Sequence, residues 1–325
     1  MLYLSTKSKG VSSALLSATI LATTGILIRY LIQEHQLEPM VLAFWRNLFL
    51  VTVLLIILEC FYPRLVEISW GDFKRFVPYG VVLALFNYLW TNSVALNGAA
   101  VATFLVYSSV PFTALLAKLL LGEYLSTIKL FSVGAALIGC LFVSCGADFS
   151  GVPFNLNGLL LGLGSGLCFA MYSTLGKDEG TRGTNPWTLL LYTFGIAAVL
   201  LFGAQFISLL CRSGIQSVAD SFFSLGFSAS GWGVLLLLAV GPTLLGFGLY
   251  NVSLGYLPAN LVNLIATSEP PITAVLAYLL FGEILTPLQV GGSTLIIGAI
   301  VISSYFETER KILPKPKLKT AGQVC

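Results

Sequence analysis

Residues 111–125 read PFTALLAKLLLGEYL, and residues 271–285 read PITAVLAYLLFGEIL. Ten of the fifteen positions are identical at a constant offset of 160 residues, far more than unrelated segments share. The similarity continues downstream, where AALIGCLFVS near residue 135 is echoed by TLIIGAIVIS near residue 294 with a slip of one residue. Self-similarity at a fixed offset indicates an internal repeat. The chain is therefore predicted to consist of two related halves.

The composition indicates a membrane protein. Of the 325 residues, 57% are hydrophobic and only 10% are charged, whereas soluble domains carry about a quarter charged residues. The long apolar runs do not alternate with polar residues as barrel strands do, so they are expected to form helices that satisfy their own backbone hydrogen bonds in lipid. The fold class is predicted to be an all-α polytopic membrane protein. Ten transmembrane helices are predicted at residues 11–32, 40–60, 76–96, 99–121, 128–146, 156–175, 187–210, 231–254, 258–281 and 287–306.

Lysine and arginine in the loops predict the orientation. With the N-terminus inside, the inner segments hold thirteen basic residues and the outer loops hold one, Arg212. Cytoplasmic loops carry such an excess, so both termini are expected in the cytoplasm. The thirteen are Lys7, Lys9, Arg64, Lys74, Arg75, Lys129, Lys177, Arg182, Arg310, Lys311, Lys315, Lys317 and Lys319.

Five helices in each half mean that the second half enters the membrane from the opposite side. The Gly122-Glu123 turn is then expected to face the cytoplasm, and its copy Gly282-Glu283 to face outside. Such a 5+5 inverted-topology repeat is typical of secondary transporters. The predicted units are residues 1–150, residues 151–310 and a basic cytoplasmic tail, 311–325.

Other function classes are disfavoured by what the sequence lacks. The six cysteines are scattered without a CxxC pair and the one histidine lies in a predicted loop, so neither a metal site nor a disulfide framework is expected. The predicted spans contain no paired carboxylate or Ser/His/Asp set, which argues against an enzyme. There is no Walker A motif, so ATP coupling is not implied. No cofactor and no nucleic-acid partner are expected.

The duplicated P-x-T-A-x-L-A-x-x-L-x-G-E run of residues 111–123 and 271–283 resembles the drug/metabolite transporter superfamily, in its ten-helix EamA-type branch. Phe44-Trp45-Arg46 resembles that family's (F/W)-x-R feature. Residues 241–251, GPTLLGFGLYN, are similar to a stretch of YddG-type aromatic amino acid exporters, with Tyr250 where tryptophan is common. The resemblance covers essentially the whole chain. It implies export of amino acids or similar small metabolites across a bacterial inner membrane.

Polar residues on the span 258–281 suggest part of a substrate site. Asn260, Asn263 and Thr267 fall on one helix face, which is expected to turn toward the bundle. Either cavity lining or hydrogen bonding between helices explains this face. Glu269 is an acidic residue well inside a span, where charge is costly. It is expected to couple protons or to cap the backbone interrupted at Pro270-Pro271.

Aromatic and hydroxyl side chains recur at helical spacing on four further spans. They predict either an aromatic cavity, suited to an apolar side chain and an ammonium group, or simply a packed core. The candidate substrate-binding residues, with Asn263, are Asn87 and Trp90 (76–96), Tyr107 and Ser108 (99–121), Phe169 and Tyr172 (156–175), and Thr243 and Tyr250 (231–254). Gly158, Gly162 and Gly166 follow a four-residue spacing that predicts close helix packing.

The leading interpretation is a secondary transporter that exports neutral amino acids, aromatic ones among them, by alternating access through a central aromatic cavity. An exporter of other small metabolites or cationic drugs, and a membrane channel, remain alternatives. Phosphorylated substrates are disfavoured because basic residues are absent from the predicted midplane. Arg29 and Arg46 are expected near the outer ends of their spans, as lipid anchors or as carboxylate attractants. The partners expected are the substrate and membrane lipid, and a monomer suffices to form the cavity.

Overall fold

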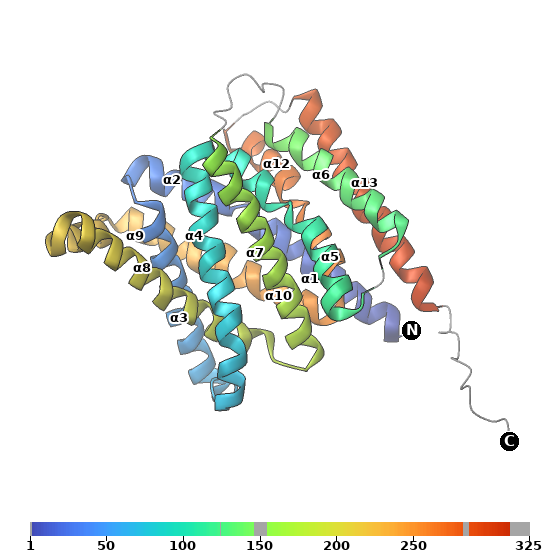
Figure 1. The fold of residues 1–325 in the computed structure, drawn as a ribbon, viewed down its shortest axis with the longest axis horizontal. Helices are drawn as coiled ribbons and strands as arrows, with labels where there is room; N and C mark the ends of the chain where they lie inside the picture. Colours follow the sequence, from blue (N-terminus) through green and yellow to red (C-terminus); the bar gives the residue numbers. More distant parts are fainter. Residues whose placement is uncertain (1, 124, 146–154, 282–285, 313–325) are drawn as a thin grey trace.

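The computed structural model describes residues 2–123, 125–145, 155–281 and 286–312 (Figure 1). Within these ranges the structure is all-helical. The helices are α1 Leu2–Leu21, α2 Thr24–His35, α3 Pro39–Phe61, the 3-10 turn Pro63–Leu65, α4 Trp70–Val106, α5 Ser109–Leu121, α6 Thr127–Cys145, α7 Leu156–Thr181, α8 Pro186–Phe222, α9 Ala229–Leu238, the π-helix Ala239–Gly246, α10 Phe247–Tyr256, α11 Ala259–Ala266, α12 Glu269–Phe281 and α13 Pro287–Ile312.

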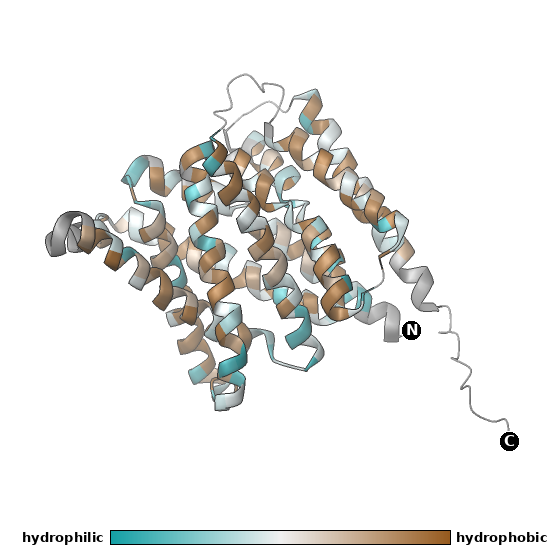
Figure 2. Ribbon diagram, viewed as in Figure 1, coloured by the Kyte–Doolittle hydropathy of each residue, from teal (hydrophilic) through white to brown (hydrophobic). Residues whose placement is uncertain are grey.

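The prediction of a polytopic helical membrane protein is confirmed. Among the described residues, eight helical stretches are long and apolar enough to cross a membrane. Two predicted spans are not among the eight. The span 76–96 lies inside α4, and the span 258–281 is divided between α11 and α12. Brown, hydrophobic residues cover the middles of the helices in Figure 2. Side chains such as Phe131, Val199 and Leu120 are 76%, 71% and 69% exposed, as expected for a surface solvated by lipid.

The 37-residue element α4 turns back on itself between Ser93 and Leu105. A Cβ atom added to Gly162 of α7 would lie 2.8 Å from both Ser93 Oγ and Leu105 Cβ. Twelve residues of straight helix would separate these two side chains by about 18 Å. The chain therefore turns back between them, and α4 contributes to two crossings, as the separate spans 76–96 and 99–121 predict.

Both halves contain a helix break at the same position, just before the repeated sequence. In the first half the break is Tyr107-Ser108, before α5, and in the second half it is Thr267-Ser268, before α12. The helices α5 (109–121) and α12 (269–281) are related by the same offset of 160 residues as the sequences. Pro270 and Pro271 lie in the first turn of α12, where the missing N–H groups cost no helical hydrogen bond.

The two copies run in opposite directions where they cross. Tyr107, just before the first copy, bonds to Glu269, the first residue of α12 and just before the second copy. Glu123, at the end of the first copy, accepts a 2.9 Å hydrogen bond from the backbone N–H of Ala259, at the start of α11. The first copy therefore runs from the break toward Ala259, antiparallel to α11. Such crossing is the geometry expected of an inverted repeat.

Helix packing follows the same pseudo-symmetry. Helix α3 packs on α8 and α6 on α13, and the α4–α7 pair corresponds to the α10–α1 pair. The close packing predicted for the glycine face of α7 is confirmed, since Cβ atoms on Gly158, Gly162 and Gly166 would approach α4 and Ser108 within 3 Å. On the other side of the bundle, a Cβ on Gly139 would lie 2.6 Å from the Gly292 carbonyl oxygen.

Three helices depart from their predicted spans. The first predicted span is interrupted at Ala22-Thr23, between α1 and α2. Helix α8 continues to Phe222, beyond residue 210, and projects from the bundle at the left of Figure 1. The eighth span contains a π-helix, because Pro242 lacks an N–H and its ring excludes the regular pattern.

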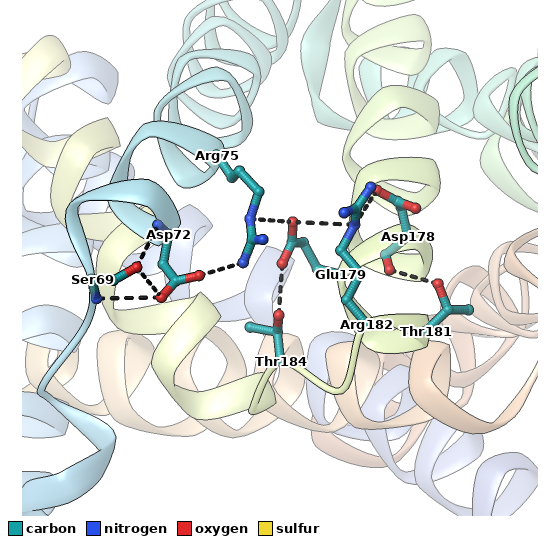
Figure 3. Close-up of polar contacts among 8 residues, drawn as sticks. All are labelled: Ser69, Asp72, Arg75, Asp178, Glu179, Thr181, Arg182 and Thr184. Atoms are coloured by element: carbon teal, nitrogen blue, oxygen red, sulfur yellow. Dashed lines mark hydrogen bonds and ion pairs between the residues drawn. The ribbon is translucent and has the colours of Figure 1, made fainter.

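The first turn of α4 is tied to the last turn of α7 (Figure 3). Ser69 and Asp72 form a capping box, in which the Ser69 hydroxyl accepts from the Asp72 N–H at 3.1 Å. Arg75 bonds to Asp72 and lies 3.5 Å from Glu179, whose carboxylate also accepts from the Thr184 hydroxyl at 2.6 Å. The Ser69 hydroxyl and then the Arg75 charge lower the pKa of Asp72 below its usual value.

Some predictions concern residues outside the described ranges. These are the Gly282-Glu283 turn, the boundary between predicted units at residues 150 and 151, and all but the first two residues of the predicted tail 311–325. The side chains of Arg29 and Arg212 also lie outside what the structure describes.

Candidate functional site

A cavity lies between the two repeats, beside the broken helices. Its volume is about 90 Å³, enough for several water molecules, since one water needs about 10–15 Å³. Side chains from seven of the ten predicted spans line it. They are Leu21, Thr24, Arg46, Phe86, Trp90, Thr103, Val106, Tyr107, Phe169, Pro242, Thr243, Phe247, Ala266 and Glu269.

Both helix breaks deliver a side chain to the cavity wall. Tyr107, from the first break, donates a 2.8 Å hydrogen bond to Oε2 of Glu269, from the second break. Helix α12 begins at Glu269, so this carboxylate also lies at the positive end of a half-helix dipole. The wall thus carries an acidic group held by one neutral partner, in a site where a charge needs compensation.

The cavity also contains a basic residue, which corrects the expectation that the midplane has none. Arg46 was predicted near the outer end of its span, but it lies seven residues beyond Pro39, about 10 Å along α3. It is only 5% exposed. Its Nη2 donates a 2.5 Å hydrogen bond to Asn87 Oδ1. The argument against anionic groups in the substrate therefore does not hold.

Hydroxyl groups occupy other parts of the wall. Thr243 donates to the Leu238 carbonyl oxygen at 2.8 Å, which satisfies the last carbonyl of α9, directly before the π-helix that contains Pro242. The Thr24 hydroxyl is buried and has no partner among the described residues. A buried polar atom without a partner marks a place where a ligand or water completes the hydrogen bonding.

One turn from the cavity, Asn263 joins three helices. Its Oδ1 accepts a 3.0 Å bond from Ser109 of α5, and its Nδ2 donates to Thr113 of α5 at 2.7 Å and to Ser173 of α7 at 3.3 Å. Ser173 also shares a 2.6 Å hydrogen bond with Tyr250 of α10. These side chains tie α5 and α7 to α10 and α11.

A second polar contact lies at the same level. Asn251 of α10 bonds to Tyr172 of α7, with contacts of 3.1 and 3.2 Å, and accepts a 3.4 Å bond from Tyr79 of α4. The Tyr79 and Tyr172 rings pack with centroids 4.5 Å apart. We call the five bonded residues Asn263, Ser173, Tyr250, Asn251 and Tyr172 the polar seal.

Helical register places the polar seal on one side of the cavity. On α7, Phe169 lines the cavity and Tyr172 follows one turn later. On α11, Ala266 lines the cavity and Asn263 precedes it by one turn. On the opposite side, a smaller pocket of about 20 Å³ shares Arg46 and Trp90 with the cavity and is lined further by Ile28, Ile32, Pro39, Leu42, Ala43, Thr91 and Val94. The space around the site thus continues away from the seal.

The structure divides the sequence-predicted residues into two groups. Trp90, Tyr107, Phe169, Thr243 and Glu269 lie in the cavity wall. The others lie behind the wall. Asn87 contacts Arg46, while the polar seal contains Tyr172, Tyr250 and Asn263. Ser108 precedes α5, and its buried hydroxyl has no partner among the described residues.

The wall also contains residues that were not among the candidate substrate-binding residues. Arg46 was expected to be a lipid anchor or a carboxylate attractant, and Phe247 lies one turn from the candidate Thr243 on the same span. Thr24 and Thr103 had no signal in the sequence, because single threonines in apolar helices are common and tertiary packing alone brings these two to the cavity. Among the described residues, no group of three His, Cys, Asp or Glu side chains is placed to hold a metal ion.

Comparison with known proteins identifies the family. The model of the EamA-like transporter family matches residues 8–145 and residues 156–305. The chain belongs to the EamA-like transporter family. Each match covers one of the two repeats, so this EamA-like chain is a transporter and a multi-pass membrane protein.

Named relatives of this EamA-like protein include exporters. It is 28% identical over 234 residues to the threonine/homoserine exporter RhtA of Escherichia coli K12, covering 71% of this chain and 69% of that one. It is 24% identical over 207 residues to a "Probable amino-acid metabolite efflux pump" of Salmonella typhimurium, covering 64% and 68%. An "Uncharacterized transporter" of Archaeoglobus fulgidus is 24% identical over 225 residues, covering 68% and 74%.

The fold is also present in a crystal structure. That structure superposes with a TM-score of 0.75 at 13% sequence identity, covering 94% of this chain and 99% of the other. At this identity the likeness concerns the fold alone.

Proposed function

We propose that this protein is a secondary transporter that exports neutral amino acids from the bacterial cytoplasm by alternating access. The observation that carries the proposal is the cavity between the repeats, in which the two helix breaks bring together Glu269 and Tyr107. A carboxylate beside aromatic rings suits the ammonium group of an amino acid. A midplane site between inverted repeats is what alternating access requires.

The cavity supports a small substrate. Its volume of about 90 Å³ suits a compact side chain better than an indole ring. The unpartnered Thr24 hydroxyl offers a hydrogen bond to a polar side chain. The relative named threonine/homoserine exporter points to the same class. We therefore place threonine and homoserine first, and the aromatic amino acids suggested by the sequence second.

The position of the polar seal supports a mechanism. The seal lies toward the end of α7 that carries Lys177 and Arg182, which the charge bias assigns to the cytoplasm. In this state the cavity is then closed to the cytoplasm, the side on which the charge bias predicts both chain ends. For export, the seal opens to admit substrate from the cytoplasm and forms again as the opposite side opens. Opening requires separation of α7 from α10 and α11.

Uptake into proteoliposomes tests the proposal. We expect labelled threonine and homoserine to accumulate in exchange for unlabelled amino acid inside, with saturation, and phenylalanine and tryptophan to compete weakly. Strong aromatic uptake would reverse the order of substrates. Absence of amino acid uptake would refute the proposal and direct the search to cationic drugs, while flux without saturation or exchange would indicate a channel.

An imposed pH gradient tests the role of Glu269. If Glu269 binds the ammonium group without coupling protons, exchange does not respond to the gradient, and Glu269→Gln weakens substrate affinity. If uptake follows the gradient and Glu269→Gln abolishes that response but not exchange, the residue couples protons. The matched control is Glu67→Gln, at an exposed glutamate between α3 and α4.

A further inference from the structure

A buried arginine side chain in the cavity wall is not explained by packing alone. Arg46 is 5% exposed, and apolar side chains such as Leu42 and Phe86 surround the same space. A guanidinium in such a position is costly unless hydrogen bonds or a counter-charge compensate it. A basic residue inside a membrane domain is by default a candidate for substrate binding.

The hydrogen bonds of Arg46 leave part of the guanidinium unused. Asn87 Oδ1 accepts from Nη2, and this partner is a neutral amide. The Nε atom is buried and has no partner among the described residues. A guanidinium presents donors in a planar fork that matches the two oxygens of a carboxylate.

Asn87 is itself held in place. Its Nδ2 donates a 2.9 Å hydrogen bond to the Leu83 carbonyl oxygen of α4, so Oδ1 is left to face Arg46. Asn87 is 1% exposed and does not line the cavity. It therefore acts as a positioning residue, which fixes the guanidinium without neutralising it.

We propose that Arg46 binds the carboxylate of the amino acid substrate, oriented by Asn87, while Glu269 in the same wall binds its ammonium group. This inference rests on the proposed function and specifies its chemistry. A site with one cation and one anion recognises a zwitterion. It discriminates against amines, which leave Arg46 uncompensated, and against simple carboxylic acids, which leave Glu269 uncompensated.

Competition by threonine and threoninamide tests this inference. The two ligands share the side chain and the ammonium group, and the amide lacks the carboxylate charge. We expect wild-type exchange to be inhibited by threonine at a concentration at least about tenfold lower than by threoninamide, because a tenfold ratio corresponds to about 1.4 kcal/mol and the loss of a charge-assisted bond costs more than this. In Arg46→Gln we expect the affinity for threonine to fall, and the ratio of the inhibitory concentrations of threoninamide and threonine to approach one. A purely structural role would weaken both ligands equally.

Controls separate the possible failures. Arg64→Gln, at an exposed arginine of the Pro63–Leu65 turn, is expected to keep the wild-type ratio. If the wild-type protein transports no amino acid, the proposed function fails. If it transports threonine but Arg46→Gln keeps the ratio, the carboxylate site is refuted. Should Arg46→Gln not fold, Asn87→Ala replaces it, and we expect the ratio to fall several-fold, with an unchanged ratio refuting the site.

Discussion

Asn263→Ala is expected to destabilise the closed side of the cavity. The substitution removes the hydrogen bonds of Asn263 to Ser109, Thr113 and Ser173, which connect α11 to α5 and α7. Hydrogen bonds between membrane helices contribute about 0.6 kcal/mol each on average. Losing three hydrogen bonds therefore shifts the equilibrium between the sealed and open states by roughly 2 kcal/mol, which raises the population of the open state by a factor of about 20 to 30.

The accessibility of an engineered thiol measures this shift. Leu254 of α10 is fully buried at the sealed end, and its carbonyl oxygen accepts a 2.9 Å bond from Lys177 of α7. In a variant in which the six native cysteines are replaced, Leu254→Cys is labelled by a membrane-impermeant maleimide only when the sealed side opens. We expect Asn263→Ala to raise the labelling rate from that side by about 20- to 30-fold, following the shift in population.

The matched control is Asn260→Ala, at the same residue type on the same helix. Asn260 is 4% exposed, and its Oδ1 has no partner among the described residues. Its substitution is expected to change the labelling rate little. Equal labelling rates in Asn263→Ala and Asn260→Ala would refute the assignment of the Asn263 contacts to a seal between the two sides.

Three further predictions concern packing, capping and pH. Gly162→Ala places a Cβ 2.4 Å from a leucine methyl and is expected to lower the free energy of unfolding by about 1–3 kcal/mol, measured as a lower melting temperature in detergent. Gly203→Ala, where no atom lies within 4 Å of the added Cβ, is expected to leave the melting temperature unchanged. Glu123→Gln weakens the bond to the Ala259 N–H and is expected to increase hydrogen exchange at that amide by about tenfold. Folding lowers the pKa of Asp72, so the ionised carboxylate stabilises the folded state above about pH 4, and this stabilisation is lost as the pH falls through the folded-state pKa. The melting temperature of Asp72→Asn is therefore expected to lie below that of the wild type at pH 7 and to approach it in acid.

Much of the fold could be predicted from the sequence. Apolar runs of about 20 residues predict helices because lipid offers the backbone no hydrogen-bond partners. The repeat at residues 111–125 and 271–285, with five spans in each half, predicts the inverted arrangement that the Tyr107–Glu269 and Glu123–Ala259 contacts display. The breaks within helices were harder to predict, because Tyr107-Ser108 and Thr267-Ser268 contain no residue that forbids a helix.

The candidate site was predictable only in part. Glu269 stood out because a charge inside a span is costly wherever the helix turns. Arg46 was expected near the outer end of its span, as a lipid anchor or a carboxylate attractant, because seven residues from the start of a span is within the uncertainty of a hydropathy boundary. Asn87, Tyr172 and Asn263 belong to polar faces that the sequence identifies, but a polar face fits a cavity and a helix contact equally well.

The sequence by itself determined that this chain crosses the membrane many times, that its halves are related and inverted, and which helix faces turn inward. These properties depend on local composition and on periodicity, which a linear pattern contains. Only the tertiary structure decided that Arg46 and Glu269 line one cavity while Asn263 seals its side. That outcome depends on how helices far apart in the sequence are rotated, how deep they lie and where they break. Close packing between helices fixes these properties, as where Gly162 packs against α4.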